Sequence, residues 1–365
     1  MSNHQASPWP AEPADLRSGV GDGGLTTAKH LTRPDAYIAA PVSFSVPMVN
    51  RIHAFTVTAL GDQLDASCLD QITHALAGAG ATIESITFLS ERGPVVVALT
   101  VTVPVTDEPV RAHGHGLRHV LLATTTAGGA SLDIAVVPAV VAAAGPRLLV
   151  ADMDSTLIQI EVIDELARRH GVGDEVAEVT RRAMSGELDF EASLRARVTR
   201  LAGLDAAVLD ELAAHLPVTD GAAALVRGVK RAGGHAAVVS GGFTFATAAL
   251  VAQLGLDHGF ANTLEIEAGR LTGRVIDPVV TPQRKAELVV ELAAHHGLAP
   301  ERVVAVGDGA NDLLMLERAG LGVAFHAKPR LSAAADTALT SGGLERILYL
   351  LGSTSAEIDA LMAPR

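Results

Sequence analysis

Apolar positions recur with a strand or helix period in two separate parts of this chain. Between residues 49 and 140, the pattern predicts strands at 52–60, 82–90, 95–103 and 131–137, and helices at 65–79 and 109–124. This strand–helix–strand–strand–helix–strand order is that of a ferredoxin-like α+β domain. Residues 1–48 are rich in Pro, Gly, Ser and charge and lack a sustained period, so we expect a mostly disordered tail with room for a short strand at 43–47.

From residue 146 to 365, continuous apolar runs alternate with helical patterns. The runs end at Ala151, Ser240, Val306 and about Ala324, which predicts a Rossmann-like parallel sheet with helices on both faces. About 80 residues separate the first two strands, whereas a crossover needs only about a dozen. We therefore expect a helical cap, about 162–216, inserted after the first core strand. A cap over a reaction site can exclude water and select the substrate.

Composition narrows the class of protein. A chain of 365 residues with 48% hydrophobic residues can form two domains with a sizeable core, and a net charge of −13 argues against nucleic acid or an anionic membrane as a partner. Cys68 is the only cysteine, so no intramolecular disulfide is expected. The polar start has no signal-peptide pattern, and Pro138 and Pro146 interrupt the most apolar stretch. We expect a soluble cytoplasmic protein.

Two carboxylates follow the first core strand, at Asp152 and Asp154. Side chains two residues apart on an extended segment point to the same side, so these two anions would crowd together. Burial and mutual repulsion would both penalise them without a cation. A hard divalent ion with oxygen ligands, such as Mg²⁺, is the natural counter-charge.

Three later segments strengthen this interpretation. Ser240 and Gly241 end the second core strand, where a hydroxyl and free backbone N–H groups can bind an anion. Lys285 follows Pro282 near a predicted helix start and can supply positive charge. The third strand ends in Gly-Asp-Gly-Ala-Asn-Asp, which places Asp308 and Asp312 at the same sheet edge.

The spacing of the histidines along the chain does not indicate a metal site. Pairs such as His113 with His115 and His295 with His296 lack cysteine partners and the spacing typical of zinc sites. We therefore expect solvated histidines and no histidine-based metal site.

Taken together, the four segments resemble the motifs of the haloacid dehalogenase-like phosphatase superfamily, in the same order. Met184 to Val198 also resembles the cap segment of the phosphoserine phosphatases, so the resemblance covers roughly residues 146–350. It implies that Asp152 is the nucleophile, forming an aspartyl-phosphate, and that Asp154 is the general acid and base. It also implies Mg²⁺ held by Asp152, the Asp154 carbonyl and Asp308, with Asp312 close by.

The resemblance further assigns the groups that bind the substrate, O-phosphoserine. Lys285, Ser240, Gly241 and Asn311 would hold the phosphate. Glu161 would pair with the substrate ammonium, Arg197 would bind its carboxylate, and Met184 and Phe190 would wall the pocket. The expected product is serine, in the last step of serine biosynthesis.

Residues 49–140 resemble an ACT domain in topology. The segment Gly61 to Ser67 lacks the glycine that follows the Asp in ACT ligand sites. Since ACT-like domains commonly associate in pairs, we expect a homodimer through this domain. Two alternatives remain open on the sequence: a related phosphatase or phosphotransferase acting on homoserine or another small phosphomonoester, and a non-catalytic regulator that senses amino acids.

Overall fold

The computed structural model describes residues 52–363, apart from 63, 92, 105–107, 130 and 145–147. The tail expected at 1–48, with its short strand, lies outside this range. All described residues belong to one compact unit of the chain. Among them, no helix has both the length and the apolar character needed to cross a bilayer.

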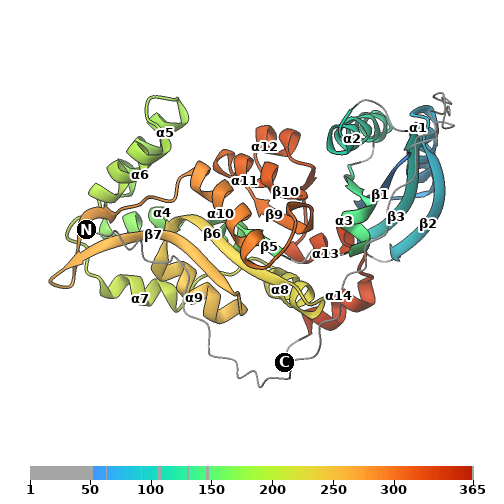
Figure 1. Cartoon of the computed structure of the whole chain (residues 1–365). Coiled ribbons are helices and arrows are strands. Elements are labelled where there is room, and N and C mark those ends of the chain that lie inside the picture. Colours follow the sequence, from blue (N-terminus) through green and yellow to red (C-terminus); the bar gives the residue numbers. More distant parts are fainter. Residues whose placement is uncertain are drawn as a thin grey trace, which may run out of the picture. The chain divides into compact units, whose positions relative to one another are not determined.

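The amino-terminal part of the described chain is a four-stranded antiparallel sheet with two helices, coloured blue to green in Figure 1. Its elements are β1 (Ile52–Gly61), α1 (Ala66–Gly78), β2 (Thr82–Ser90), β3 (Val95–Pro104), α2 (Val110–Ala127) and β4 (Asp133–Pro138). The strand order β2-β3-β1-β4 confirms the ferredoxin-like topology. Helix α1 begins where predicted because the Asp65 carboxylate accepts a hydrogen bond from Cys68 N at 2.9 Å.

A short helix, α3 (Ala139–Ala144), leads towards a seven-stranded sheet in the order β11-β10-β9-β5-β6-β7-β8. Its strands are β5 (Leu148–Ala151), β6 (His235–Phe243), β7 (His258–Glu267), β8 (Arg270–Ile276), β9 (Val303–Gly307), β10 (Leu321–Phe325) and β11 (Thr337–Leu339). The residues of β5 and β9 are buried without exception, which explains their continuous apolar runs.

Helices cover both faces of this sheet, as predicted. Helices α8 (Ala222–Arg231), α9 (Thr244–Leu254) and α14 (Ser355–Met362) lie on one side in Figure 1, and α10 (Pro282–His295), α11 (Leu313–Arg318) and α12 (Pro329–Ala334) lie on the other. The short α13 (Ile347–Leu350) precedes α14.

Strand order reverses at β5, between β6 and β9. The carboxyl ends of these three strands therefore form the crevice where open α/β sheets bind ligands.

The segment between β5 and β6 is helical, as predicted for a cap. It contains α4 (Val162–His170), α5 (Gly173–Met184), α6 (Phe190–Thr199) and α7 (Ala207–Ala213). Gly171 ends α4 in the left-handed region, at φ 80°, as its position after His170 indicated. An isolated antiparallel bridge between Ile158 and Val218 joins the entry and the exit of the inserted segment.

The sequence interpretation missed the β7–β8 hairpin, in which β8 runs antiparallel to β7. Ala268 and Gly269 form its tight turn with φ values of 50° and 76°. A two-residue turn with both φ values positive usually begins with Asn, Asp or Gly. Because Ala268 carries no such signal, the two strands could not be recognised as a hairpin from the local sequence.

Candidate active site

Asp152 lies immediately beyond β5 and is 4% exposed. Its Oδ1 accepts a hydrogen bond from Met153 N at 2.7 Å. The chain then makes a single turn, Met153–Leu157, in which Ser155 adopts φ 55°. A left-handed conformation is uncommon for a residue with a side chain. This turn directs Asp152 and Asp154 to the carboxyl edge of the sheet.

Lys285 links two carboxylates that come from different strands. Its Nζ lies 2.7 Å from Asp152 Oδ1 and 2.8 Å from Asp312 Oδ1, and its side chain is fully buried. Helix α10 delivers the lysine because Thr281 caps its start and accepts a hydrogen bond from Arg284 N. Burial acts to lower the pKa of Lys285, but the two carboxylates outweigh it and raise that pKa above its usual value. The lysine is therefore a fixed positive charge.

One lysine does not balance the carboxylates gathered here. Carboxylate oxygens of Asp152, Asp308 and Asp312 lie within 4.8 Å of one another. Without a further cation, burial and the Asp312 charge raise the pKa of Asp152 above its usual range, and burial with Asp312 and Glu161 raises the pKa of Asp308 to about 6. Such an excess of crowded, desolvated oxygen ligands fits a hard divalent metal ion.

Asp154 borders the same site and has the pKa of a group that can both give and take a proton. Its side chain is only partly buried, but desolvation by the surrounding protein and the charge of Glu161 raise the pKa of Asp154 to about 7. The hydrogen bond from Val162 N acts in the opposite direction and lowers that pKa. Its Oδ2 lies 3.5 Å from Ser240 Oγ. A pKa near neutrality is suited to general acid–base catalysis.

Glycines allow the close approach of side chains to this strand end. A Cβ placed on Gly242 would lie 2.5 Å from Asp154 Oδ2, and one on Gly241 would lie 2.7 Å from the Phe190 ring. Larger residues would displace the carboxylate or the cap. The two glycines after Ser240 therefore keep space for Asp154 and the cap, and the Gly242 N–H donates to Ser240 Oγ at 2.8 Å.

A cavity of ≈ 580 Å³ opens over these residues, between the sheet edge and the cap. This size is typical of small-molecule sites. The core contributes Asp152, Asp154, Gly241, Asp308 and Asn311 to its lining, and the cap contributes Glu161, Met184, Phe190 and Arg197.

The cap side of the cavity carries one acid and one base suited to a zwitterionic ligand. Glu161 accepts a hydrogen bond from Ser155 Oγ at 3.0 Å. Arg197 donates to the Ser193 carbonyl at 3.4 Å and, within the described chain, forms no ion pair. Burial lowers the pKa of Arg197, although Asp164 and Glu161 oppose the shift. A guanidinium with spare donors in a cavity can bind a carboxylate through two hydrogen bonds.

The structure brings all the residues predicted for the site into one region. Ser240, Lys285 and Asp312 are fully buried and lie outside the cavity lining, whereas Met184 is 71% exposed and lines the rim. Their individual roles stay predictions.

Several residues at the site were missed by sequence reasoning. Thr156 donates to Asp308 Oδ1 at 3.4 Å, and buried Asn262 donates to the Gly241 carbonyl at 2.7 Å. Lys328 and Arg330 line the cavity and add positive charge at its rim. The sequence signal for Lys328 and Arg330 was their position just after β10, because the carboxyl end of this parallel strand faces the same crevice.

The expectation that the paired histidines are simply solvated is wrong. His115 Nε2 lies 2.6 Å from an Asp336 oxygen, and His296 is partly buried among other histidines. Their partners are distant in the sequence, so spacing between neighbouring histidines carried no information about them.

Two family models match the chain. Residues 149–317 match the haloacid dehalogenase-like hydrolases, and residues 53–137 match the ACT domain. The chain is 48% identical over 304 residues to a phosphoserine phosphatase of Streptomyces coelicolor, and the match covers 83% of this chain and 72% of that protein.

Solved structures show the same similarity. A crystal structure of a probable phosphoserine phosphatase from Vibrio cholerae, in unliganded form, superposes with a TM-score of 0.62 at 37% identity, covering 84% of this chain and 88% of that one. A structure described as a phospho-aspartyl intermediate analogue of phosphoserine phosphatase superposes with a TM-score of 0.53 at 42% identity, covering 56% of this chain and 98% of that one.

Proposed function

We propose that this chain, which belongs to the phosphoserine phosphatase family of the haloacid dehalogenase-like hydrolases, hydrolyses O-phosphoserine to serine and phosphate. The reaction completes serine biosynthesis. The observation that carries the proposal is the contact of buried Lys285 with both Asp152 and Asp312, where Asp152 lines a cavity whose cap side holds Glu161 and Arg197.

The first step forms a covalent intermediate on Asp152. A carboxylate oxygen attacks phosphorus in line, the bond from phosphorus to the serine oxygen breaks, and an aspartyl-phosphate results. Lys285 stabilises the charge of the transferring phosphoryl group through its contact with Asp152. The structure of a phospho-aspartyl intermediate analogue in this family supports this step.

Asp154 moves the proton in both steps. In its acid form it protonates the departing serine alkoxide, and in its basic form it takes a proton from the water that attacks the aspartyl-phosphate. That attack releases phosphate and regenerates the Asp152 carboxylate. The raised pKa of Asp154, about 7, supports this double role, since both forms are accessible at neutral pH.

Asp152 and Asp308 are the residues we propose as side-chain ligands of a divalent cation, with the Asp154 backbone carbonyl. Asp312 would orient the site or bind through water, because its Oδ1 is already engaged by Lys285 and its Oδ2 accepts from Gly309 N. We propose Mg²⁺, because carboxylate and carbonyl oxygens form the ligand set it prefers. Bound there, it would neutralise the carboxylates and polarise the phosphoryl oxygens.

The remaining groups bind the substrate. Ser240, the Gly241 N–H and Asn311 hold phosphate oxygens, Glu161 pairs with the ammonium group, and Arg197 binds the carboxylate. Met184 and Phe190 form the apolar wall. The presence of Glu161 and Arg197 on the cap side of one cavity supports this division.

The amino-terminal domain contributes to assembly rather than to chemistry in this proposal. We divide the chain into an ACT-like domain at 49–140 and a phosphatase domain at 146–365 with its cap at about 162–216, ranges that contain the family matches at 53–137 and 149–317. We infer a homodimer through the first of these. The cytoplasmic location expected from the sequence stays a prediction.

Turnover of O-phosphoserine by the purified chain tests the proposal. Activity should require Mg²⁺, disappear with a chelator, and favour phosphoserine over homoserine phosphate and over phosphomonoesters without an amino acid group. Asp152→Asn should reduce kcat by several orders of magnitude, because an amide is a far poorer nucleophile, while the fold is retained.

Three outcomes would count against the proposal. A preference for homoserine phosphate would favour the related phosphatase or phosphotransferase. Absence of turnover with every ester would favour a non-catalytic amino-acid sensor. Near-normal activity in Asp152→Asn, with deamidation excluded by mass spectrometry, would mean that another group attacks phosphorus.

A further inference from the structure

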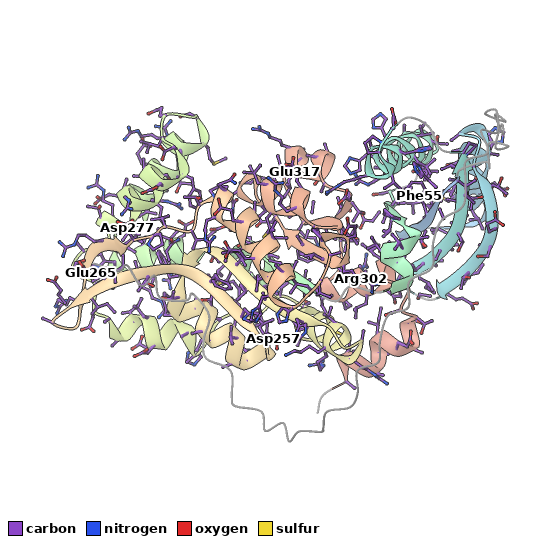
Figure 2. All side chains as sticks on the ribbon, in the orientation of Figure 1. Phe55, Asp257, Glu265, Asp277, Arg302 and Glu317 are labelled. Atoms are coloured by element: carbon purple, nitrogen blue, oxygen red, sulfur yellow. The ribbon has the colours of Figure 1, made fainter. Side chains whose placement is uncertain are left out.

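Four histidines gather at the amino-terminal edge of the core sheet, opposite the catalytic edge. His235 is the first residue of β6 and His258 the first of β7, while His295 ends α10 and His296 caps it. Because β6 and β7 run parallel and α10 runs back across the sheet, their ends meet here. Asp257, labelled in Figure 2, directly precedes β7 at this edge.

Three of these rings each place one nitrogen atom close to the same point. One nitrogen each from His258, His295 and His296 lies within 4.8 Å of the others. The His258 and His296 Nε2 atoms are 2.9 Å apart. The fourth ring, His235, stacks on His296 with a centroid separation of 3.7 Å and limits the directions in which His296 can turn.

These separations suit a transition-metal ion of the size of Zn²⁺. With Zn–N bonds of about 2.0–2.1 Å, nitrogens in a tetrahedral site lie about 3.3 Å apart. His258 and His296 would therefore separate by a few tenths of an ångström, and the exposed His295 would rotate inwards. Imidazole nitrogen is a preferred ligand of Zn²⁺, Ni²⁺ and Cu²⁺, whereas Mg²⁺ prefers oxygen.

The end of α10 favours a cation at the cluster, because the carboxyl end of this helix carries the negative end of the helix dipole. Asp257 accepts from Ala236 N at 2.9 Å and so holds the starts of β6 and β7 together. Its charge is balanced by Lys230, whose Nζ lies 2.7 Å from Asp257 Oδ1, so this pair adds no net charge beside the rings.

We propose that His258, His295 and His296 bind one divalent transition-metal ion, with Zn²⁺ as the representative, at a site separate from the catalytic carboxylates. The ion joins the carboxyl end of α10 to the start of β7. Lys285 lies ten residues before His295 on α10, or about 15 Å along the helix. The ion therefore fastens the helix that carries Lys285 from its opposite end.

Zn²⁺ binding to the full chain tests this site. Binding is measured by equilibrium dialysis with metal analysis, in excess Mg²⁺ and in an Asp308→Asn background that weakens the carboxylate cluster. One Zn²⁺ per chain should remain bound and should raise the melting temperature. His295→Gln should weaken the affinity by at least 10–100-fold, the loss that even the outer partners of a metal ligand produce.

His295 is exposed, so His295→Gln should fold normally, and His296→Gln provides a second variant. His215→Gln is the matched control, because His215 is an exposed histidine just beyond α7. Co²⁺ should give the visible spectrum of a tetrahedral nitrogen site in the parent chain and the control. Equal Zn²⁺ affinity in His295→Gln, His296→Gln and the control would overturn the proposal. So would complete loss of Zn²⁺ binding in Asp308→Asn with the histidines intact.

Discussion

In the proposed mechanism, single residues on the cap select the phosphate ester. The carboxylates, Lys285 and Ser240 would bind the phosphate, which all candidate substrates share. Arg197 and Glu161 would bind the amino acid part, and their side chains line the same cavity as Asp152, the proposed nucleophile. Selectivity should therefore be separable from catalysis by substitutions in the cap.

Arg197→Ala should weaken phosphoserine turnover selectively. Loss of charge-assisted hydrogen bonds costs about 1.5–3 kcal/mol, or roughly 10–150-fold in kcat/KM. An ester without a carboxylate should lose much less. Arg195→Ala is the matched control, because Arg195 lies two residues earlier and pairs with Glu191 and Asp277. An equal decline on both esters would show that Arg197 is structural.

Glu161 should tune the proton chemistry of Asp154. Its negative charge contributes to the raised pKa of Asp154, so Glu161→Gln should lower that pKa. Because the proposed first step requires protonated Asp154, activity should be lost as pH rises through its pKa, and the alkaline limb of kcat/KM should move to lower pH.

An ester without an amino group is the substrate for this profile, since Glu161 then has no ammonium to bind. Glu175→Gln, at an exposed position in the cap, serves as the control. An alkaline limb that stays in place would mean that Asp154 is not the group that titrates in it.

At the scale of elements, a buried carboxylate of the core sheet holds helix α2 of the amino-terminal part. Asp336 precedes β11 and is 6% exposed. It accepts two hydrogen bonds from Arg111 of α2, at 2.7 Å each, and one from Gly322 N at 2.6 Å, and it lies 2.6 Å from His115 Nε2. These contacts fasten α2 to the edge of the core sheet.

Asp336→Asn should destabilise the chain without touching the active site. Removal of one partner from a buried ion pair costs about 3–5 kcal/mol, and the value should fall at the low end because the Arg111 side chain is 35% exposed. Urea unfolding measures the change, and Asp359→Asn on the exposed face of α14 is the control. Stability equal to the control would mean that the contact contributes nothing net.

At the scale of the whole molecule, the edge strand β2 is the surface best suited to a second copy. Ile86 and Phe88 on β2 are 44% and 51% exposed, and β2 has a hydrogen-bonded neighbour on one side only. An edge strand with exposed apolar side chains can pair with another chain. This supports the proposed homodimer through the amino-terminal domain.

Phe88→Glu should convert the proposed dimer to a monomer of 37.5 kDa in light scattering while phosphatase activity persists. Val120→Glu, at a 43% exposed position on α2, should leave the mass unchanged. A truncated chain beginning at Ala144 should also be monomeric and retain Mg²⁺-dependent activity.

That truncated chain should be less stable, because Thr340 loses its hydrogen bonds from N and Oγ1 to Asp133, at 2.9 and 2.7 Å. Full dimerisation of either Phe88→Glu or the truncated chain would contradict the assembly proposal.

The sequence by itself determined the elements and the strand-end chemistry of this protein. Hydrophobic periodicity, caps such as Asp65 and Thr281, and the stop at Gly171 act over a few residues, so they can be recognised locally. The fold class followed from the order of those elements. Carboxylates after β5 and β9 could be placed at one edge because parallel strands share a carboxyl end.

Only the tertiary structure decided which distant side chains meet. The bridge from Lys285 to both Asp152 and Asp312, the contact of Asp336 with α2, and the histidine cluster of β7 and α10 each join elements whose order in space differs from their order in the chain. The order of the strands in the sheet and the direction of the crossovers determine which of these side chains lie next to one another. They are products of packing the whole core, and no local pattern of residues encodes them.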